Sequence, residues 1–195
     1  MFSLTKLSPT ITDMIRFDHS HVMVTFHQYT VAQKPKVKKA LAETICTALE
    51  IHATLEEEIF YPVMRQLEGA DPTMLKAEPE HNEMRRIIAQ LRATPATHTK
   101  HDELLHELMR DVMHHVADEE TVLLPDAESR LSPDRLSELG AEMTRRRLQL
   151  VTPQAGKIAA DTAIGFSGST AAMVLGVAGA AFAAFKLIPR KGAPA

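Results

Sequence analysis

Two segments of the chain repeat one pattern of residue types that bind metals. Each contains a histidine with a glutamate four residues later, His52 with Glu56 and His115 with Glu119. In both segments a second glutamate follows at once, and a proline stands ten residues after the histidine. Residues four apart on an α-helix share a face, so each pair can direct an imidazole and a carboxylate at one point. A single copy is usually a solvated surface pair, but two copies in matched register indicate a shared function.

A lone histidine precedes each pair at nearly the same distance. His19 stands 33 residues before His52, and His81 stands 34 residues before His115. Each half of the chain therefore supplies one single histidine and one histidine–glutamate pair. Two halves of this kind can pack with approximate two-fold symmetry, which would bring these side chains together.

Four imidazoles and two carboxylates inside a protein need a partner, because burying such groups unpaired costs several kcal/mol. A metal ion removes that cost. Imidazole and carboxylate without thiolate suit iron or manganese and permit zinc. Six ligands exceed the four of a closed structural zinc site, so they favour two ions bridged by the carboxylates. The predicted metal ligands are His19, His52, Glu56, His81, His115 and Glu119.

Two ions that share these ligands keep open coordination positions. If each ion takes two imidazoles and one oxygen from each bridging glutamate, an octahedral ion retains about two positions for a bridging oxygen species, water or substrate. Open positions on a redox metal allow chemistry with dioxygen, peroxide or nitric oxide.

Several neighbouring side chains are weaker candidates for the site. Glu57 and Glu120 are alternative ligands or, as we favour, acceptors of hydrogen bonds from the ligands. Tyr29 and Tyr61 offer hydroxyl groups to a bound oxygen species, although packing is the simpler role for each. His27 lies two turns beyond the first ligand on the same predicted helix, and a surface or core position is the simpler reading.

The remaining histidines have ordinary explanations. His114 also has an acidic residue four positions later, but the register of the repeated proline favours His115 as the ligand. Arg85 either offsets carboxylate charge near the centre or lies exposed. The histidines expected on solvated helix faces are His98, His101 and His106.

Long helices must position these residues. A serine or aspartate followed by proline is typical of a helix start, and it occurs at residues 8–9, 71–72 and 132–133. Gly69 is expected to end the second helix. The predicted helices span about residues 9–30, 35–69, 72–92, 95–130 and 133–149. Long helices joined by short loops indicate an all-α fold, an antiparallel up-down four-helix bundle with an extra C-terminal helix and an apolar helical tail.

The pattern divides the chain into three regions. Residues 1–131 form the predicted bundle, residues 132–152 an additional helix and linker, and residues 153–195 an Ala/Gly-rich apolar tail. Three prolines, Pro62, Pro79 and Pro125, fall inside predicted helices and are expected to kink or break them.

Composition and charge exclude several classes of protein. Cys46 is the only cysteine, so neither an intrachain disulfide nor a cysteine-based zinc cluster can form. The net charge of −3 combines +6 over residues 143–195 with −9 over residues 1–142. An acidic body of this kind argues against nucleic acid as a partner, because phosphate contacts need clustered lysine and arginine. The first 30 residues lack the apolar core of a secretory signal, which favours a cytoplasmic location.

The tail has a different character from the body. Residues 163–185 are 23 consecutive residues without a charge, of which eight are alanine and four glycine. A helix of this length spans about 35 Å, which exceeds a bilayer core of ~30 Å. We expect association with the inner face of a membrane, with a flexible or bundle-packed helix as the alternative.

The combined motif resembles the hemerythrin-like, HHE cation-binding domain over about residues 10–130. The resemblance implies a bundle around a non-haem di-iron centre whose ligands are the six residues named above. Oxygen-carrying members have a further histidine where this chain has Arg85, and an aspartate five residues after the last histidine where this chain has Glu119 at four. The chain is therefore more similar to the bacterial and iron-sensing branches.

We expect a protein with two iron ions that binds or senses dioxygen, nitric oxide or iron. One alternative is a di-iron oxidoreductase that consumes peroxide or nitric oxide, so the sequence leaves open whether the protein is an enzyme. A second alternative is a membrane-tethered interaction protein with a structural metal.

Overall fold

The computed structural model describes residues 9–68 and 72–166, and these are helical throughout apart from short turns, without a strand. The prediction of an all-α fold is thereby confirmed for the described residues. The elements are α1 (Ile11–Gln28), α2 (Pro35–Leu55), η2 (Glu56–Phe60), α3 (Tyr61–Glu68), α4 (Pro72–Ala93), α5 (Thr99–Asp118), η3 (Glu119–Leu123), α6 (Leu124–Arg130), α7 (Pro133–Val151), η4 (Thr152–Gln154) and α8 (Ala155–Gly165).

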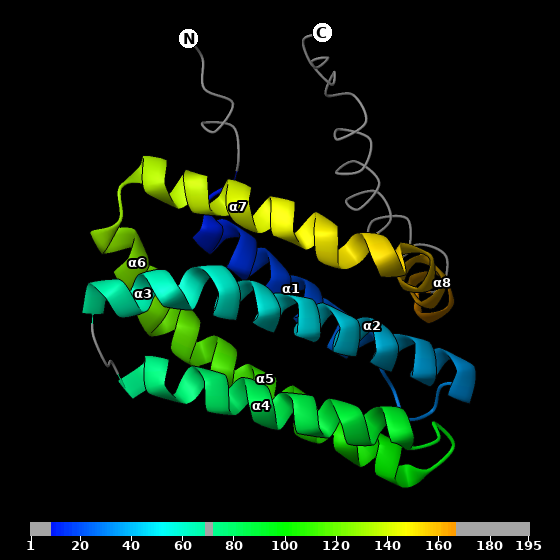
Figure 1. Ribbon diagram of the computed structural model, residues 1–195. Helices are drawn as coiled ribbons and strands as arrows, with labels where there is room; N and C mark the ends of the chain where they lie inside the picture. Colours follow the sequence, from blue (N-terminus) through cyan, green and yellow to red (C-terminus); the bar gives the residue numbers. More distant parts are fainter. Residues whose placement is uncertain (1–8, 69–71, 167–195) are drawn as a thin grey trace, which may run out of the picture.

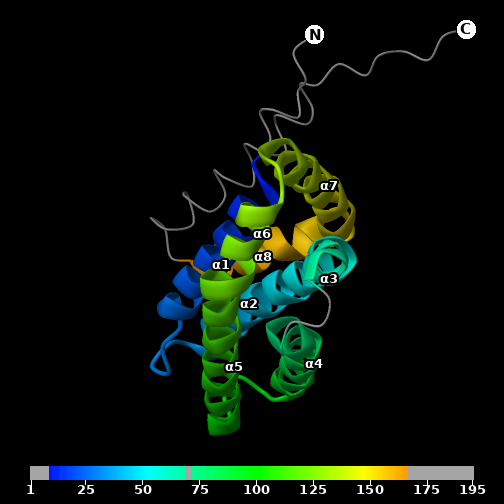
Figure 2. The same cartoon turned by 90° about the vertical axis from the view of Figure 1, so that its left-hand side faces the viewer.

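Several of these elements join end to end into long continuous helical segments (Figure 1). One such segment consists of α2, η2 and α3, and another consists of α5, η3 and α6. These two segments lie side by side with α1 and α4, and helices that follow one another in the chain run in opposite directions. Figure 2 shows α7 on the side of α1 and α2 that faces away from α4 and α5, and α7 packs on both of these helices.

Local capping explains where two of the helices begin. Thr10 caps α1, because its hydroxyl accepts a hydrogen bond from the Asp13 amide at 3.1 Å while Asp13 accepts one from the Thr10 amide at 3.2 Å. The predicted start with Pro9 in the first turn was wrong, because Pro9 precedes the helix and Thr10 caps it two residues later than expected. The expected stop at Gly69 lies outside the described residues. Ser132 caps α7 as its sequence predicts, with Pro133 in the first turn.

Two of the three internal prolines follow a widened helical turn. The π-helical segments η2 and η3 end directly before residues 61 and 124, where the amides of Tyr61 and Leu124 donate to the carbonyls of Glu56 and Glu119. A proline one position later has no amide hydrogen to donate, so the regular α-helical ladder is already interrupted there. The expected break at Pro79 does not occur, since α4 continues through it as one helix.

The core consists of two apolar clusters separated by a polar layer. One cluster includes Val22, Leu49, Met84 and Val112, each one turn from a predicted histidine ligand. The other includes Ile15, Phe60, Ala77 and Leu123, which lie about one turn from the same polar layer on its opposite side. Burial of each large aliphatic or aromatic side chain contributes about 1.5–3 kcal/mol, and these clusters hold the polar layer between them.

The chain beyond α7 turns back onto the bundle. Helix α8 packs along α2, and a Cβ atom on Gly165 would lie 2.9 Å from Cδ2 of Leu41, so a larger residue there would require the Leu41 side chain to shift. Phe166 is buried in the apolar cluster that contains Val22. None of the helices described combines the length and the apolar character needed to cross a membrane. The greater part of the uncharged segment, from residue 167 onward, lies outside the described residues.

Candidate metal centre

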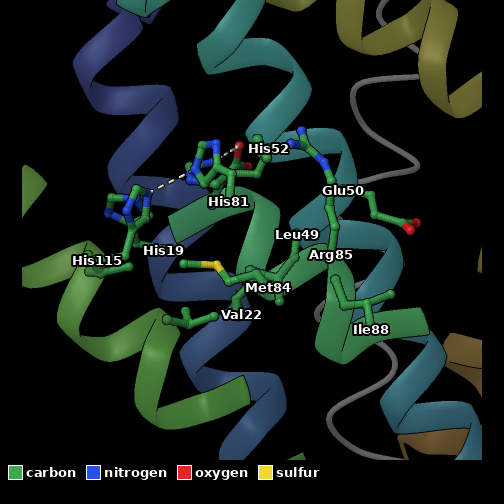
Figure 3. A pocket seen from close by; sticks show the side chains of 14 residues that line it. His19, Val22, Leu49, Glu50, His52, His81, Met84, Arg85, Ile88 and His115 are labelled. Atoms are coloured by element: carbon green, nitrogen blue, oxygen red, sulfur yellow. Dashed lines mark hydrogen bonds and ion pairs between the residues drawn. The ribbon is translucent and has the colours of Figure 1, made fainter. Parts of the chain in front are cut away.

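The six predicted ligands converge in the polar layer between the two apolar clusters. Figure 3 shows the four histidines, which come from α1, α2, α4 and α5, turned toward one another. The two glutamates begin the π-helical segments η2 and η3. All six side chains are buried.

Two groups of candidate ligand atoms lie close enough to hold one ion each. The first group is His19, His52, Glu56 and Glu119, and the second is Glu56, His81 and His115. Within each group the ligand atoms lie within 4.8 Å of one another. Because Glu56 belongs to both groups, its carboxylate has the position of a bridge between two ions.

The spacing between ligand atoms suits a metal. Nε2 of His52 lies 3.2 Å from Oε2 of Glu56, and Nε2 of His19 lies 3.2 Å from Oε2 of Glu119. Two ligands that each lie about 2.1 Å from one ion are about 3.0 Å apart when they subtend a right angle, and about 3.4 Å apart at a tetrahedral angle. The observed separations therefore match those of neighbouring ligands on one ion.

Unpaired polar atoms also indicate a cation. Nε2 of His19, Nε2 of His52, Oε1 of Glu56 and Oε2 of Glu119 are buried without a hydrogen bond of regular geometry, although Nε2 of His19 and Oε2 of Glu119 lie 3.2 Å apart as an ion pair. Such atoms cost about 1–3 kcal/mol each when nothing satisfies them. Nε2 of His81 faces Nε2 of His115 at 3.0 Å, which would place two lone pairs opposite each other if both imidazoles are neutral. A metal ion satisfies all of these atoms, so the residues present fit one.

Each histidine directs its second ring nitrogen, Nδ1, at a carboxylate. The pairs are His19 with Glu120 at 2.9 Å, His81 with Glu57 at 2.9 Å, His115 with Glu80 at 2.9 Å and His52 with Asp18 at 3.4 Å. An Nδ1–H that donates to a carboxylate leaves Nε2 free as a metal ligand and fixes the ring orientation. The expectation that Glu57 and Glu120 accept hydrogen bonds from ligands agrees with these contacts.

Two of these four carboxylates accept hydrogen bonds from arginine side chains. Arg85 donates to Glu57 at 2.7 Å, so it offsets carboxylate charge rather than standing alone on the surface. Arg147 of α7 donates to both oxygens of Asp18 at 2.6 Å. Burial raises the pKa of Asp18, but its hydrogen bonds with His52 and Arg147 outweigh burial, so the pKa is lowered and the carboxylate stays ionised.

The two glutamates differ electrostatically in the metal-free protein. Burial and the charge of Glu119 raise the pKa of Glu56 well above its ordinary value. Burial also acts to raise the pKa of Glu119, but the charge of His115 and the hydrogen bond from His19 lower it overall. The protein therefore places the negative charge on Glu119.

The histidines also differ. Burial acts to lower the pKa of His19, but the hydrogen bond to Glu119 and the charges of Glu119 and Glu56 raise it to about 9. Burial lowers the pKa of His52 and of His81. At neutral pH, without a metal, His19 is therefore protonated and lies beside the ionised Glu119.

Tyr61 belongs to the centre, whereas the sequence favoured a packing role for it. Its buried hydroxyl donates to Oε1 of Glu119 at 2.8 Å and lies 3.3 Å from Oε2 of Glu56 and 3.4 Å from Nε2 of His81. Burial and the charges of Glu56 and Glu119 raise the pKa of Tyr61 well above its ordinary value. The phenol therefore stays protonated and is a hydrogen-bond donor at the edge of the ligand cluster.

A small cavity lies on the histidine side of the centre. Its volume is about 20 Å³, and the walls beside the imidazoles are mainly apolar, including Val22, Leu49 and Met84 (Figure 3). Val112 also lines the cavity. A water molecule needs roughly 10–15 Å³ measured in this way, so the cavity accommodates one molecule of that size class. Arg85 and Glu50 also border it.

The other side chains singled out from the sequence lie away from the centre. His27 and His114 are exposed. Tyr29 donates to Asp102 and contacts His101 at 3.1 Å. The prediction that His101 is solvated was wrong, because this contact and the surrounding helices bury it to 3 % exposure.

Comparison with known proteins agrees with this geometry. The family model "Hemerythrin HHE cation binding domain" matches residues 10–127, which is more than half of the chain. A solved structure of a hemerythrin HHE cation binding domain-containing protein from Mycobacterium kansasii superposes with a TM-score of 0.65 at 19% identity, and the match covers 77% of this chain and 92% of that one.

A curated relative is longer than this chain. A DNA nickase from Nostoc sp. (strain PCC 7120) is 28% identical over 137 residues, which cover 70% of this chain but 39% of the nickase. The expected resemblance is confirmed by the family match and by the shared fold. The chain belongs to the hemerythrin HHE cation-binding domain family, and its histidine and glutamate groups are positioned to bind metal.

Proposed function

We propose that the chain holds two iron ions between Glu56 and Glu119 and binds a small uncharged molecule beside them as a binding or sensing protein. Dioxygen and nitric oxide are the proposed ligands, and the supply of iron is a further signal that such a centre can report. His19 and His52 would hold one ion, and His81 and His115 the other. Iron supplies open coordination positions and one-electron redox chemistry when bound.

The size and the lining of the cavity beside the imidazoles are our reason for proposing a small ligand. Its volume of about 20 Å³ fits one small molecule, and much of its wall beside the imidazoles is apolar, with Val22, Leu49, Met84 and Val112, while charged side chains, among them Arg85 and Glu50, border it as well. An apolar pocket against open metal positions favours an uncharged diatomic molecule over a larger organic substrate. Mixed imidazole and carboxylate ligands favour iron over a closed zinc site.

Metal counting and spectroscopy test this proposal. The chain is loaded anaerobically with Fe(II), its iron content is measured, and dioxygen is then admitted and removed. We expect about two irons per chain and a visible absorption band that appears with dioxygen and reverses on its removal. One zinc per chain with no spectral response to dioxygen would contradict the proposal.

Consumption of peroxide is a second candidate, favoured by Tyr61. Disproportionation of two peroxide molecules to two water molecules and one dioxygen needs no outside reductant, and the hydroxyl of Tyr61, which lies against Glu119 and Glu56, would donate a hydrogen bond to peroxide beside the ions. Catalytic loss of added peroxide by the iron-loaded protein, absent in Tyr61→Phe, would support this enzyme function. Reversible binding without turnover would favour the first proposal.

We do not extend the activity named for the cyanobacterial relative to this chain. The match spans 39% of that nickase, and residues 1–142 here carry nine more acidic than basic side chains. Contacts to nucleic-acid phosphates need clustered lysine and arginine. Conversion of supercoiled plasmid to the nicked form by the iron-loaded protein would overturn this part of the proposal.

A further inference from the structure

Helix α7 lies outside residues 10–127, which the family model matches, yet it packs closely on the helices that carry the metal ligands. Gly140 makes the close approach of α7 to the start of α1 possible. A Cβ atom at that position would lie 2.1 Å from the backbone oxygen of Pro9 and 3.0 Å from the backbone carbon of Thr10. Only glycine therefore lets α7 lie this close to the start of α1.

Two turns further along α7, one side chain reaches the centre. Arg147 donates from both terminal nitrogens to the two oxygens of Asp18, each at 2.6 Å. Asp18 in turn accepts from Nδ1 of His52 at 3.4 Å, and Nε2 of His52 lies 3.2 Å from Glu56. A continuous line of polar contacts thus runs from α7 to the ligand cluster.

Arg147 fixes the orientation of the Asp18 carboxylate, which the other contacts of Asp18 would not fix. Asp18 is 8 % exposed, and the long contact to His52 does not determine how its carboxylate is turned. A planar guanidinium that binds both oxygens at once determines the orientation, which a lysine ammonium cannot do in the same way. The orientation of the His52 ring depends on that carboxylate.

We propose that Arg147 is a positioning residue for His52, and that α7 therefore contributes a residue that supports metal binding at the centre. This inference rests on the proposed function, because it requires His52 to bind a metal. It predicts that loss of the Arg147 contact weakens the ion held by His19 and His52 and leaves the ion held by His81 and His115 in place.

The adjacent arginine provides a matched control. Arg146 lies next to Arg147 on the same helix and pairs with Glu58, whose side chain is 43 % exposed. Within the described part of the chain, Glu58 pairs with Arg146 and with none of the proposed ligands. Replacement of either arginine by methionine removes one charge and one ion pair from α7, but only Arg147→Met breaks the line of contacts to His52.

The experiment measures metal retention in the full chain. Wild type, Arg147→Met and Arg146→Met are loaded with Fe(II) under anaerobic conditions, and each bound ion is titrated with a competing chelator. For Arg147→Met we expect one of the two ions to bind 10- to 100-fold more weakly and the other to be unchanged. Arg146→Met should match wild type. Equal affinities in all three proteins would overturn the inference.

Two further variants separate positioning from general destabilisation. In an Asp18→Asn background, Arg147→Met should cause no further loss of affinity, because the contact is already broken. Gly140→Ala keeps the residues of the contact line unchanged but displaces α7, and Arg147 with it, so it should weaken the same ion. If Arg147→Met lowered the affinities for both ions equally, or weakened binding as much in the Asp18→Asn background, the role would be structural and the inference would fail.

The same titration distinguishes the inference from the proposed function. Two tightly bound ions in wild type, with no effect of Arg147→Met, would leave the proposed function standing and remove the inference. A wild-type chain that takes up fewer than two ions would overturn both.

Discussion

Oε1 of Glu120 lies 2.9 Å from Nδ1 of His19, so the residue that follows one proposed ligand in the chain orients another ligand on a different helix. The counterpart contact joins Glu57 to His81 at the same distance. Each half of the chain thus orients the lone histidine of the other half. This exchange explains why the repeated sequence contains a second glutamate directly after the first.

Replacement of Glu120 by alanine should weaken metal binding. The loss of the acceptor frees the His19 ring, and removal of such outer partners typically lowers metal affinity about 10- to 100-fold. Competition against a chelator measures the change. Glu58→Ala is the control, since Glu58 is also an exposed glutamate of this region but pairs with Arg146. Equal affinities for the two variants would contradict the role of Glu120.

Tyr61→Phe should destabilise the metal-free protein more than the loaded protein. The variant leaves the buried Oε1 atom of Glu119 without its donor at 2.8 Å, which costs about 1–3 kcal/mol. A bound ion would compensate part of this loss by taking the carboxylate as a ligand. Urea unfolding of both forms measures the difference, and an equal loss in both forms would show that the metal does not contact this carboxylate.

The sequence predicted the helices and the ligand cluster because both follow from spacing along the chain. Proline and capping residues mark helix starts to within a few positions, as at Pro133 and Pro72. Spacing of four residues places His52 with Glu56, and the matched register of the two halves brings the other ligands to the same layer. These are properties of single helices and of an internal symmetry, which a sequence displays directly.

The features that the sequence did not predict break that symmetry. Tyr61 stands five residues after Glu56, and the matching position after Glu119 is Leu124, so comparison of the two halves could not single it out. Arg147 belongs to a helix without a counterpart in the repeat. The burial of His101 depends on contact with Tyr29, which is 72 residues away in sequence. Such contacts arise from packing between helices.

Metal binding should release at least one proton at pH 7.5. In the metal-free protein the pKa of His19 is raised to about 9, so this imidazole is protonated at neutral pH and must lose its proton to bind a metal. The stabilisation of the metal-free fold by the charged ring is present below the ordinary pKa of histidine and is lost as pH rises through about 9. Metal affinity should therefore increase between pH 7 and 9.

Calorimetry measures this release. Titration of metal into the protein in buffers with different ionisation enthalpies gives the number of protons lost per chain. His27→Gln provides a control, because His27 is exposed and should leave the number unchanged. A metal affinity that is constant over this pH range, with no proton released, would contradict the charge assigned to His19.

Filling the cavity should block the small ligand and leave the iron in place. Val112 is 2 % exposed and lines the cavity of about 20 Å³ beside the imidazoles. Val112→Phe places its larger ring in that space at a cost of about 1–3 kcal/mol of stability. Iron content should remain near two per chain, while dioxygen or nitric oxide should bind at least tenfold more weakly. Val112→Ala enlarges the cavity and should speed ligand binding.

A second overpacked variant separates occlusion from strain. Ile87 lies in the same apolar cluster but does not line the cavity, so Ile87→Phe should destabilise the fold without altering ligand affinity. Iron analysis, thermal unfolding and ligand titration on the three variants give the comparison. If Val112→Phe and Ile87→Phe weakened the ligand equally, the effect would come from distortion of the bundle. A ligand held in the cavity requires a loss specific to residue 112, so equal losses would contradict the proposed binding site.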